Sequence, residues 1–241
     1  MQRINRRIRI LVIVGVALIL VAAGWWLFRF VSSPTRQALD AWFNDPAARP
    51  ALATNLTTPC PGAPFRLPSS GLIGLLYGDA SGLYTPLNPH SGIDIFGDGD
   101  AGTVPVYAAY NGYLTRLPDW KSAVIIRVPN DPLNPSRQIW LYYTHMASQS
   151  GEQSYISPNF APGTSEKFVR QGELLGYQGL YNGGEGARHI GLHLHFSVVL
   201  SNEDGSFRNE TRFANTLDPS PYLGMTLNAA SHPTIPARCG S

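Results

Sequence analysis

The stretch Gly-Leu-His-Leu-His-Phe-Ser-Val-Val at residues 191–199 decides the fold of this chain. Most of its residues are apolar, β-branched or aromatic, which favours a β-strand. Side chains two apart in a strand point to the same face, so His193 and His195 project together while Leu192, Leu194 and Phe196 turn into a core. Two imidazoles on one strand face suit a metal site, and a solvent-facing strand edge is the alternative from this stretch alone.

The composition is typical of a turn-rich β protein. The chain has 241 residues with 24 glycines, 20 prolines and only 14% charged residues. Such a composition favours strands and tight turns over helices. Apolar runs predict consecutive antiparallel strands at residues 104–114, with a kink at Asn111-Gly112, and at residues 122–128 and 138–146. Residues 168–176 read as strand, turn and strand, and a glycine-rich loop then leads into the 191–199 strand.

Charge is segregated along the chain, although the net charge is only +2. Six of the eighteen basic residues lie in the first 36 positions, which hold no acid. Residues 37–241 therefore carry twelve basic and sixteen acidic residues, a net charge of −4. A mildly acidic domain lacks the basic surface that nucleic acids require, so a nucleic-acid partner is excluded.

Residues 10–30 are predicted to be a membrane anchor. Ile10 to Phe28 is an uncharged run of 19 residues, about the length of a helix that spans a bilayer. Trp25 and Trp26 lie at its far end, where an interfacial aromatic belt would sit. The basic tail at residues 1–9 should stay in the cytoplasm, which makes this a single-pass protein of the cell membrane with an extracytoplasmic domain. A cleaved signal peptide is the competing interpretation, and the length of the run favours an uncleaved anchor that contacts the lipid bilayer.

The rest of the chain divides into a linker and one domain. Residues 31–59 are predicted to be a linker, with a short helix at Arg36–Phe43 and an extended Pro- and Thr-rich tether after it. Residues 60–241 are long enough for one domain with its own core. The only cysteines, Cys60 and Cys239, bracket this domain. In an oxidising compartment an even count favours one disulfide between them, with two free thiols as the alternative.

Three β-like segments each carry a histidine with a polar companion at even spacing. His90 precedes Asp94 by four residues, Tyr143 and His145 are expected to share one face at the end of a strand, and the third segment is the 191–199 strand. Four of the six histidines of the chain fall in these places. Two histidines and a carboxylate form a common catalytic zinc set with an open position for water. The remaining histidines could act as base and transition-state stabiliser.

These segments resemble the signature of the lysostaphin-like (LytM-type) zinc metallopeptidases, which cleave peptide bonds in bacterial peptidoglycan. That family shows H-x-x-x-D, then Y-x-H at a strand end, then H-x-H within HLHF. This chain has the three motifs in that order at residues 90–94, 143–145 and 193–196. Residues 105–112, 169–176 and 217–219 are also similar, so the resemblance covers roughly residues 70–223.

The resemblance implies a mainly β fold, an antiparallel sheet of the duplicated hybrid motif type with an open groove walled by loops. His90, Asp94 and His195 match the family's zinc ligands, and His145 and His193 match its catalytic histidines. The implied function is a membrane-anchored endopeptidase with one zinc ion, which remodels the cell wall by hydrolysing cross-links or stem peptides of peptidoglycan. Division or wall-synthesis proteins are possible partners that the sequence does not identify.

Two departures from the family pattern lie at the groove wall. The Ser/Thr-Gly-x stretch that usually precedes HLHF is replaced by the loop at residues 182–190. The glutamate that commonly follows HLHF is replaced by Ser197. Both changes bear on substrate preference more than on zinc binding.

Three other functions remain open at this point. A non-catalytic wall-binding or amidase-activating module of the same fold would lack a motif residue, and none is missing here. An iron oxygenase with two histidines and a carboxylate usually has H-x-D spacing rather than the three-residue gap of His90 and Asp94. A structural division or sporulation protein of the same family is the third alternative. The sequence also leaves open which of His145 and His193 is the base.

Overall fold

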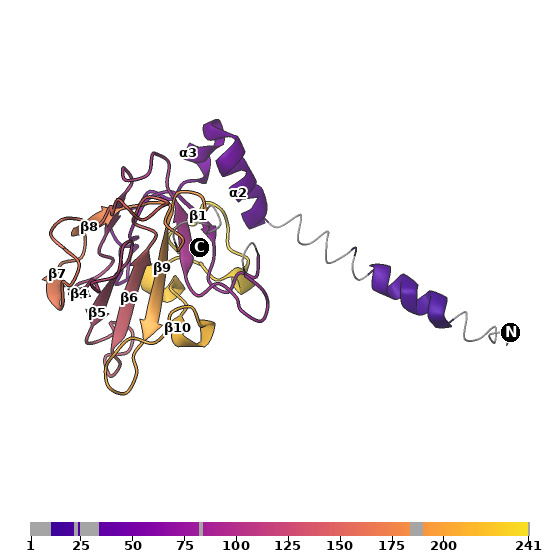
Figure 1. Cartoon of the computed structure of the whole chain (residues 1–241). Helices are drawn as coiled ribbons and strands as arrows, with labels where there is room; N and C mark the ends of the chain where they lie inside the picture. The colour runs from indigo at the N-terminus through magenta and orange to yellow at the C-terminus, as the bar shows by residue number, and fades with distance from the viewer. Residues whose placement is uncertain (1–10, 22–23, 25–33, 82–83, 184–189, 241) are drawn as a thin grey trace.

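The computed structural model describes residues 11–21, 24, 34–81, 84–183 and 190–240 (Figure 1). Most strands among these residues form one antiparallel sheet in the order β1-β2-β9-β6-β5-β4-β7, with β10 also pairing with β9. Strands β3 and β8 form a separate two-stranded sheet. This architecture confirms the mainly antiparallel β fold that the sequence predicts. The strands are β1 (Leu72–Leu75), β2 (Ile93–Phe96), β3 (Pro105–Tyr107), β4 (Gly112–Thr115), β5 (Val124–Val128), β6 (Ile139–Thr144), β7 (Lys167–Val169), β8 (Leu174–Tyr177), β9 (His193–Leu200) and β10 (Thr216–Leu217).

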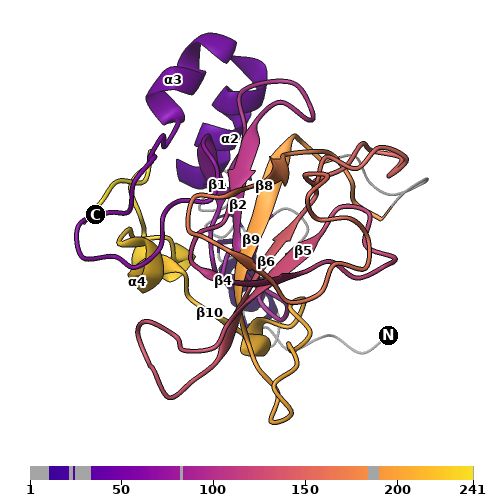
Figure 2. The same cartoon turned by 90° about the vertical axis from the view of Figure 1, so that its left-hand side faces the viewer.

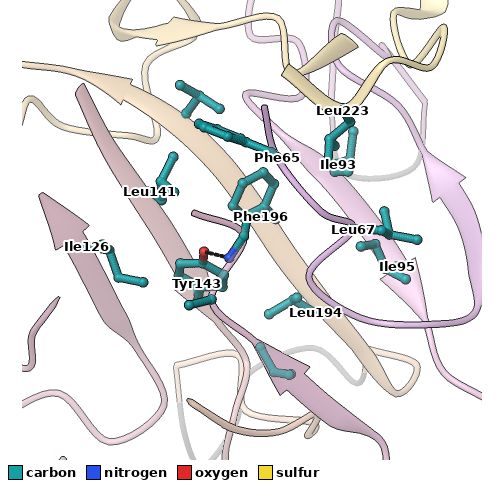
Figure 3. Close-up of a cluster of buried hydrophobic side chains, with 14 of the residues drawn as sticks. Phe65, Leu67, Ile93, Ile95, Ile126, Leu141, Tyr143, Leu194, Phe196 and Leu223 are labelled. Carbon is teal, nitrogen blue, oxygen red and sulfur yellow. Dashed lines mark hydrogen bonds between the residues drawn. The ribbon is translucent and has the colours of Figure 1, made fainter. Parts of the chain in front are cut away.

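Strand β9 lies at the centre of the large sheet. It pairs with β2 on one side and β6 on the other. Its alternation is as predicted, because Leu194, Phe196 and Val198 enter the main core and His193 and His195 face the other way. Figure 3 shows Leu194 and Phe196 among the core side chains of the neighbouring strands. The central strand is therefore fixed by a core on one face, which holds the two histidines in place on the other.

The predicted strand at residues 104–114 is not one strand. It divides into β3 and β4, which belong to different sheets, with residues 108–111 turning between them. Gly112 lets the chain approach β5 closely, because a Cβ at this position would lie 2.4 Å from the carbonyl oxygen of Arg127. The kink expected at Asn111-Gly112 is thus a change of sheet.

The segment expected as a linker contains three short helices, α2 (Pro34–Asn44), η1 (Pro46–Ala48) and α3 (Arg49–Leu52). Helix α2 includes the short helix predicted at Arg36–Phe43 and ends at Asn44, because Pro46 disfavours a helical conformation at Asp45. Ala38 and Trp42 are buried against Leu72 of β1 and Phe96 of β2. Figures 1 and 2 both show α2 and α3 beside the β1 end of the sheet. These residues therefore pack on the domain.

A disulfide joins Cys60 to Cys239, as the sequence predicts, with their Cα atoms 5.4 Å apart. The helices near the chain end are η2 (Phe213–Asn215), α4 (Ser220–Leu223) and η3 (Ala229–Ser231). Tyr222 and Leu223 of α4 are buried in the main core. The crosslink and α4 together hold the C-terminal residues against the start of the domain.

Within the described residues, no helix has both the length and the apolarity needed to cross a membrane. Residues 11–21 are helical, and most of their large apolar side chains are exposed, Leu11 by 71% and Val21 by 70%. Residues 10, 22–23 and 25–30 of the predicted anchor lie outside the described residues. The membrane anchor therefore stays a prediction.

Candidate metal centre

Strands β2 and β9 bring together the three residues expected to bind zinc. Asp94 lies directly opposite His195 in the antiparallel pair. His90 belongs to the loop before β2, where its backbone N–H donates to Asp79 and its carbonyl accepts from Gly78. The distances are 3.0 Å from His90 Nε2 to His195 Nδ1, 2.9 Å from His195 Nδ1 to Asp94 Oδ1, and 3.2 Å from His90 Nε2 to Asp94 Oδ1. All three side chains are buried.

This triangle fits a small divalent cation. Ligand atoms about 2.0–2.1 Å from a tetrahedral zinc lie about 3.3 Å from one another, close to the three distances observed. The outer nitrogens of both imidazoles have partners. His90 Nδ1 donates to the Leu76 carbonyl at 3.1 Å, and His195 Nε2 lies 2.7 Å from the Ser197 hydroxyl. These outer contacts fix the orientation of both rings, so that their inner nitrogens face Asp94, as outer hydrogen-bond partners do in zinc sites.

The charges of the centre favour a cation at the same place. Burial favours the neutral carboxyl of Asp94, but the surrounding imidazoles, His90 and His193 foremost, hold its pKa well below the usual range. Burial disfavours the charged ring of His195, yet the hydrogen bonds and charges of Asp94 and Glu210 outweigh it and raise the pKa of His195 to about 10. The centre therefore stabilises a positive charge beside the Asp94 carboxylate. A bound metal ion would supply that charge.

His193 and His145, the two expected catalytic histidines, lie beside this triangle. Their rings are 4.4 Å apart, and the His145 ring is 6.2 Å from that of His195. His193 Nδ1 donates to the Gly191 carbonyl at 2.7 Å, and His145 Nδ1 donates to the Tyr181 carbonyl at 2.6 Å. Each neutral ring therefore keeps the lone pair of its Nε2 for a proton.

Both of these histidines are held neutral. Burial, reinforced by the neighbouring His193 ring, lowers the pKa of His145 to about 3. Burial also lowers the pKa of His193, although the Asp94 carboxylate acts in the opposite direction. Neutral imidazoles beside a candidate hydrolytic metal can accept a proton from water and pass it on.

The expectation that Tyr143 and His145 share a strand face is wrong. Tyr143 lies opposite Phe196 in the core, where its hydroxyl accepts a hydrogen bond from the Ala109 N–H at 2.9 Å (Figure 3). Thr144, the next residue, lies opposite His195, so strict alternation would return residue 145 to the core. His145 instead has φ of 75°, a left-handed conformation that ends the strand and directs its ring to His193. A strained backbone of this kind is common at functional sites.

Two residues of the centre carry no signal in the sequence. The ring of Tyr84 lies 4.4 Å from that of His90, and burial together with the charge of Asp94 raises the pKa of its hydroxyl, which stays protonated. Glu210 Oε2 lies 3.6 Å from His195 Nε2. Glu210 thus brings a carboxylate to His195 from a distant segment of the chain.

No protein-family model matches this chain, and no curated protein matches it. Among solved structures, lysostaphin from Staphylococcus simulans is 21% identical with a TM-score of 0.37, over 62% of this chain and 48% of that one. The catalytic domain of the prophage-encoded M23 protein EnpA from Enterococcus faecalis is 22% identical with a TM-score of 0.35, over 64% and 95%. A zinc-containing peptidase from Vibrio cholerae is 17% identical with a TM-score of 0.32, over 65% and 39%.

The chain resembles LytM/lysostaphin-type M23 peptidases. It spans about half the length of the lysostaphin chain that it matches. The function proposed below rests on the residues of the metal centre rather than on these likenesses.

Proposed function

We propose that this protein is a zinc-dependent endopeptidase that hydrolyses peptide bonds of bacterial peptidoglycan, in a cross-link or a stem peptide. One observation carries the proposal. Three buried ligand atoms of His90, Asp94 and His195 lie within 3.2 Å of one another, next to the imidazoles of His145 and His193, whose Nδ1 atoms donate to backbone carbonyls. A purely structural zinc site is closed by a fourth protein ligand, whereas a hydrolytic site has three protein ligands and an open position.

His90, Asp94 and His195 would hold one zinc ion. Zinc in such a set lowers the pKa of a bound water towards neutrality and polarises a carbonyl group. The protein contributes two proton acceptors, His145 and His193, whose Nδ1 atoms are fixed by backbone carbonyls. One ring takes the proton of the attacking water on its Nε2 and delivers it to the leaving amine. The other ring is neutral at rest; it takes up a proton from solvent on Nε2 as negative charge develops on the substrate carbonyl, and donates a hydrogen bond to that oxyanion.

The peptidase domain is proposed to be tethered to the cell membrane by residues 10–30, with the N-terminus in the cytoplasm. The long apolar run after four arginines supports this arrangement. The Cys60–Cys239 disulfide agrees with an extracytoplasmic location, because disulfides persist in oxidising compartments. N-terminal sequencing of the mature protein tests the tether, and a start beyond residue 23 would replace it with a cleaved signal peptide.

The decisive experiment combines metal analysis with peptidoglycan digestion by the full chain. We expect one zinc per chain and release of peptide fragments that mass spectrometry of the muropeptides identifies. Loss of all release on chelation, and its return with added zinc, would tie the activity to the metal. A protein that holds stoichiometric zinc but digests no peptidoglycan preparation would instead be a non-catalytic wall-binding or amidase-activating module.

A further inference from the structure

A cavity of about 290 Å³ adjoins the metal centre on the side of His145. His145 and Tyr181 form one part of its wall, and Glu210 forms another. Both parts adjoin the centre, because the His145 ring lies 4.4 Å from that of His193 and Glu210 Oε2 lies 3.6 Å from His195 Nε2. A group bound in this cavity would therefore lie next to the scissile bond of a substrate at the metal.

The cavity has an excess of negative charge. Glu210 and Asp119 line it together with one cation, Lys121, whose ammonium lies 5.9 Å from the centre of the Tyr181 ring. Glu210 is half-buried, with 21% of its side chain exposed. Within the described part of the chain no lysine or arginine forms an ion pair with it, and its charged neighbour is His195. A half-buried carboxylate in a cavity favours a cationic ligand.

Aromatic side chains provide a second feature that suits a cation. Trp120 and Tyr142 both line the cavity, with ring centres 5.7 Å apart at an angle of 85°. Tyr142 lies opposite Ser197 in the β6–β9 pair, so its ring stands on the same face of the sheet as His195. Aromatic faces attract ammonium groups, more strongly where solvent is excluded.

We propose that this cavity is a subsite for a primary ammonium group of the substrate peptide, recognised by Glu210 and by the faces that the Trp120 and Tyr142 rings turn to the cavity. The proposal rests on the peptidase function above and specifies its substrate as a peptide with a free amine close to the cleaved bond. Two sources supply this chemistry, the side chain of a diamino acid and a free α-amine. The cavity volume accommodates a short aliphatic amine from each source.

Peptide binding tests the subsite without depending on turnover. The full-length His193→Ala variant, loaded with zinc, is titrated by calorimetry with a short lysine-containing peptide and with the same peptide acetylated at the side-chain amine or at the α-amine. We expect acetylation of one of these amines to weaken binding about tenfold, which identifies the source of the ammonium group. Equal affinity for all three peptides would overturn the proposal.

Substitutions locate the effect in the cavity. In the His193→Ala background, adding Glu210→Gln should reduce the affinity ratio of free to acetylated peptide to below about twofold. Adding Asp119→Asn should reduce the same ratio by a smaller amount. Glu203→Gln is the matched control, because Glu203 is an exposed acid of the same segment outside the cavity, and it should leave the ratio unchanged. The ratio is informative even if Glu210→Gln weakens zinc binding, since a weaker metal site lowers both affinities together.

If the affinity ratio of free to acetylated peptide is unchanged in both Glu210→Gln and Asp119→Asn, the amine binds elsewhere and the subsite is refuted. Digestion of peptidoglycan by the wild-type chain is measured separately. Failure of that digestion with an intact affinity ratio contradicts the peptidase function and leaves the ammonium site standing. Digestion with no discrimination between the peptides contradicts the ammonium site alone.

Discussion

Helix α2 is connected to the candidate metal centre through two successive ring contacts, and the effect of breaking the first of them can be tested quantitatively. The Phe43 ring packs edge-on against Phe96 with ring centres 5.5 Å apart, and the Phe96 ring stacks on His193 at 5.0 Å. Phe43 also touches Gly191, whose carbonyl accepts the hydrogen bond of His193 Nδ1. A change at the contact between Phe43 and Gly191 should therefore alter both stability and the placement of His193.

The structure sets the size of the effect. Phe43 is 47% exposed, so Phe43→Ala should cost about 2 kcal/mol, roughly half the value for a fully buried phenylalanine. A Cβ at residue 191 would lie 2.4 Å and 2.5 Å from two ring carbons of Phe43, so Gly191→Ala should cost about 1–3 kcal/mol by overpacking. With Phe43→Ala in place that clash disappears. The double variant should then cost less than the sum of the single variants by about 1–2 kcal/mol.

The assay is urea unfolding of the full chain with each single variant, the double variant and wild type, together with the turnover of each on peptidoglycan. Phe168→Ala is the control, because Phe168 is similarly exposed, by 52%, and lies on β7 at the far end of the sheet. Turnover should fall in Gly191→Ala, recover in part in the double variant and stay unchanged in Phe168→Ala. Strictly additive unfolding free energies would refute the contact between α2 and the start of β9.

Three further outcomes follow from the centre and the crosslink. His195→Ala should lose zinc, measured by elemental analysis. His193→Ala and His145→Ala should keep zinc but lower turnover by about 10²–10⁴-fold. Loss of zinc in all three variants would contradict the assignment of His195 as a ligand and of the other two as proton-transfer groups. Zinc affinity should rise with pH by up to about tenfold per pH unit between about pH 6 and 8. The pKa of His195 is raised to about 10, so zinc must displace a proton from this ring when it binds. Competition titrations against a chelator measure the affinity, and a flat or falling pH profile would contradict the prediction. The double substitution Cys60→Ser and Cys239→Ser should lower the free energy of unfolding by about 2–5 kcal/mol in denaturant titrations, and an unchanged midpoint would show that the crosslink does not stabilise the fold.

Local patterns in the sequence were sufficient for the central strand and its two histidines. A period of two depends only on the pleat of a strand, so the alternation at residues 193–198 predicted which side chains enter the core and which face the site. The same holds for the end of α2, because Asp45-Pro46 stops a helix without help from distant residues. The family resemblance implied that His90, Asp94 and His195 form one ligand set, and the structure brings their ligand atoms within 3.2 Å of one another.

Other features depend on contacts between segments far apart in the chain. The packing of α2 on the sheet requires the particular fit of Trp42 and Ala38 to β1 and β2, so a fragment that begins at residue 60 would expose that surface. The division of residues 104–114 between two sheets depends on which partner strands are available, β8 for one part and β5 with β7 for the other. Neither outcome is determined by local propensity.

The candidate metal centre likewise combines features that the sequence predicts with features that depend on the tertiary structure. The resemblance of the sequence motifs to a known family implied which histidines and which aspartate form the centre, and strand periodicity added only that His193 and His195 share a face. Only the tertiary structure decided how His145 reaches it, through a backbone turn with φ of 75° that reverses the face expected from alternation. It also decided that Glu210 meets His195, a contact between separate segments that no spacing rule predicts. A left-handed residue and a long-range contact are stabilised by the packing of the whole domain, and for that reason they become visible only once the chain has folded.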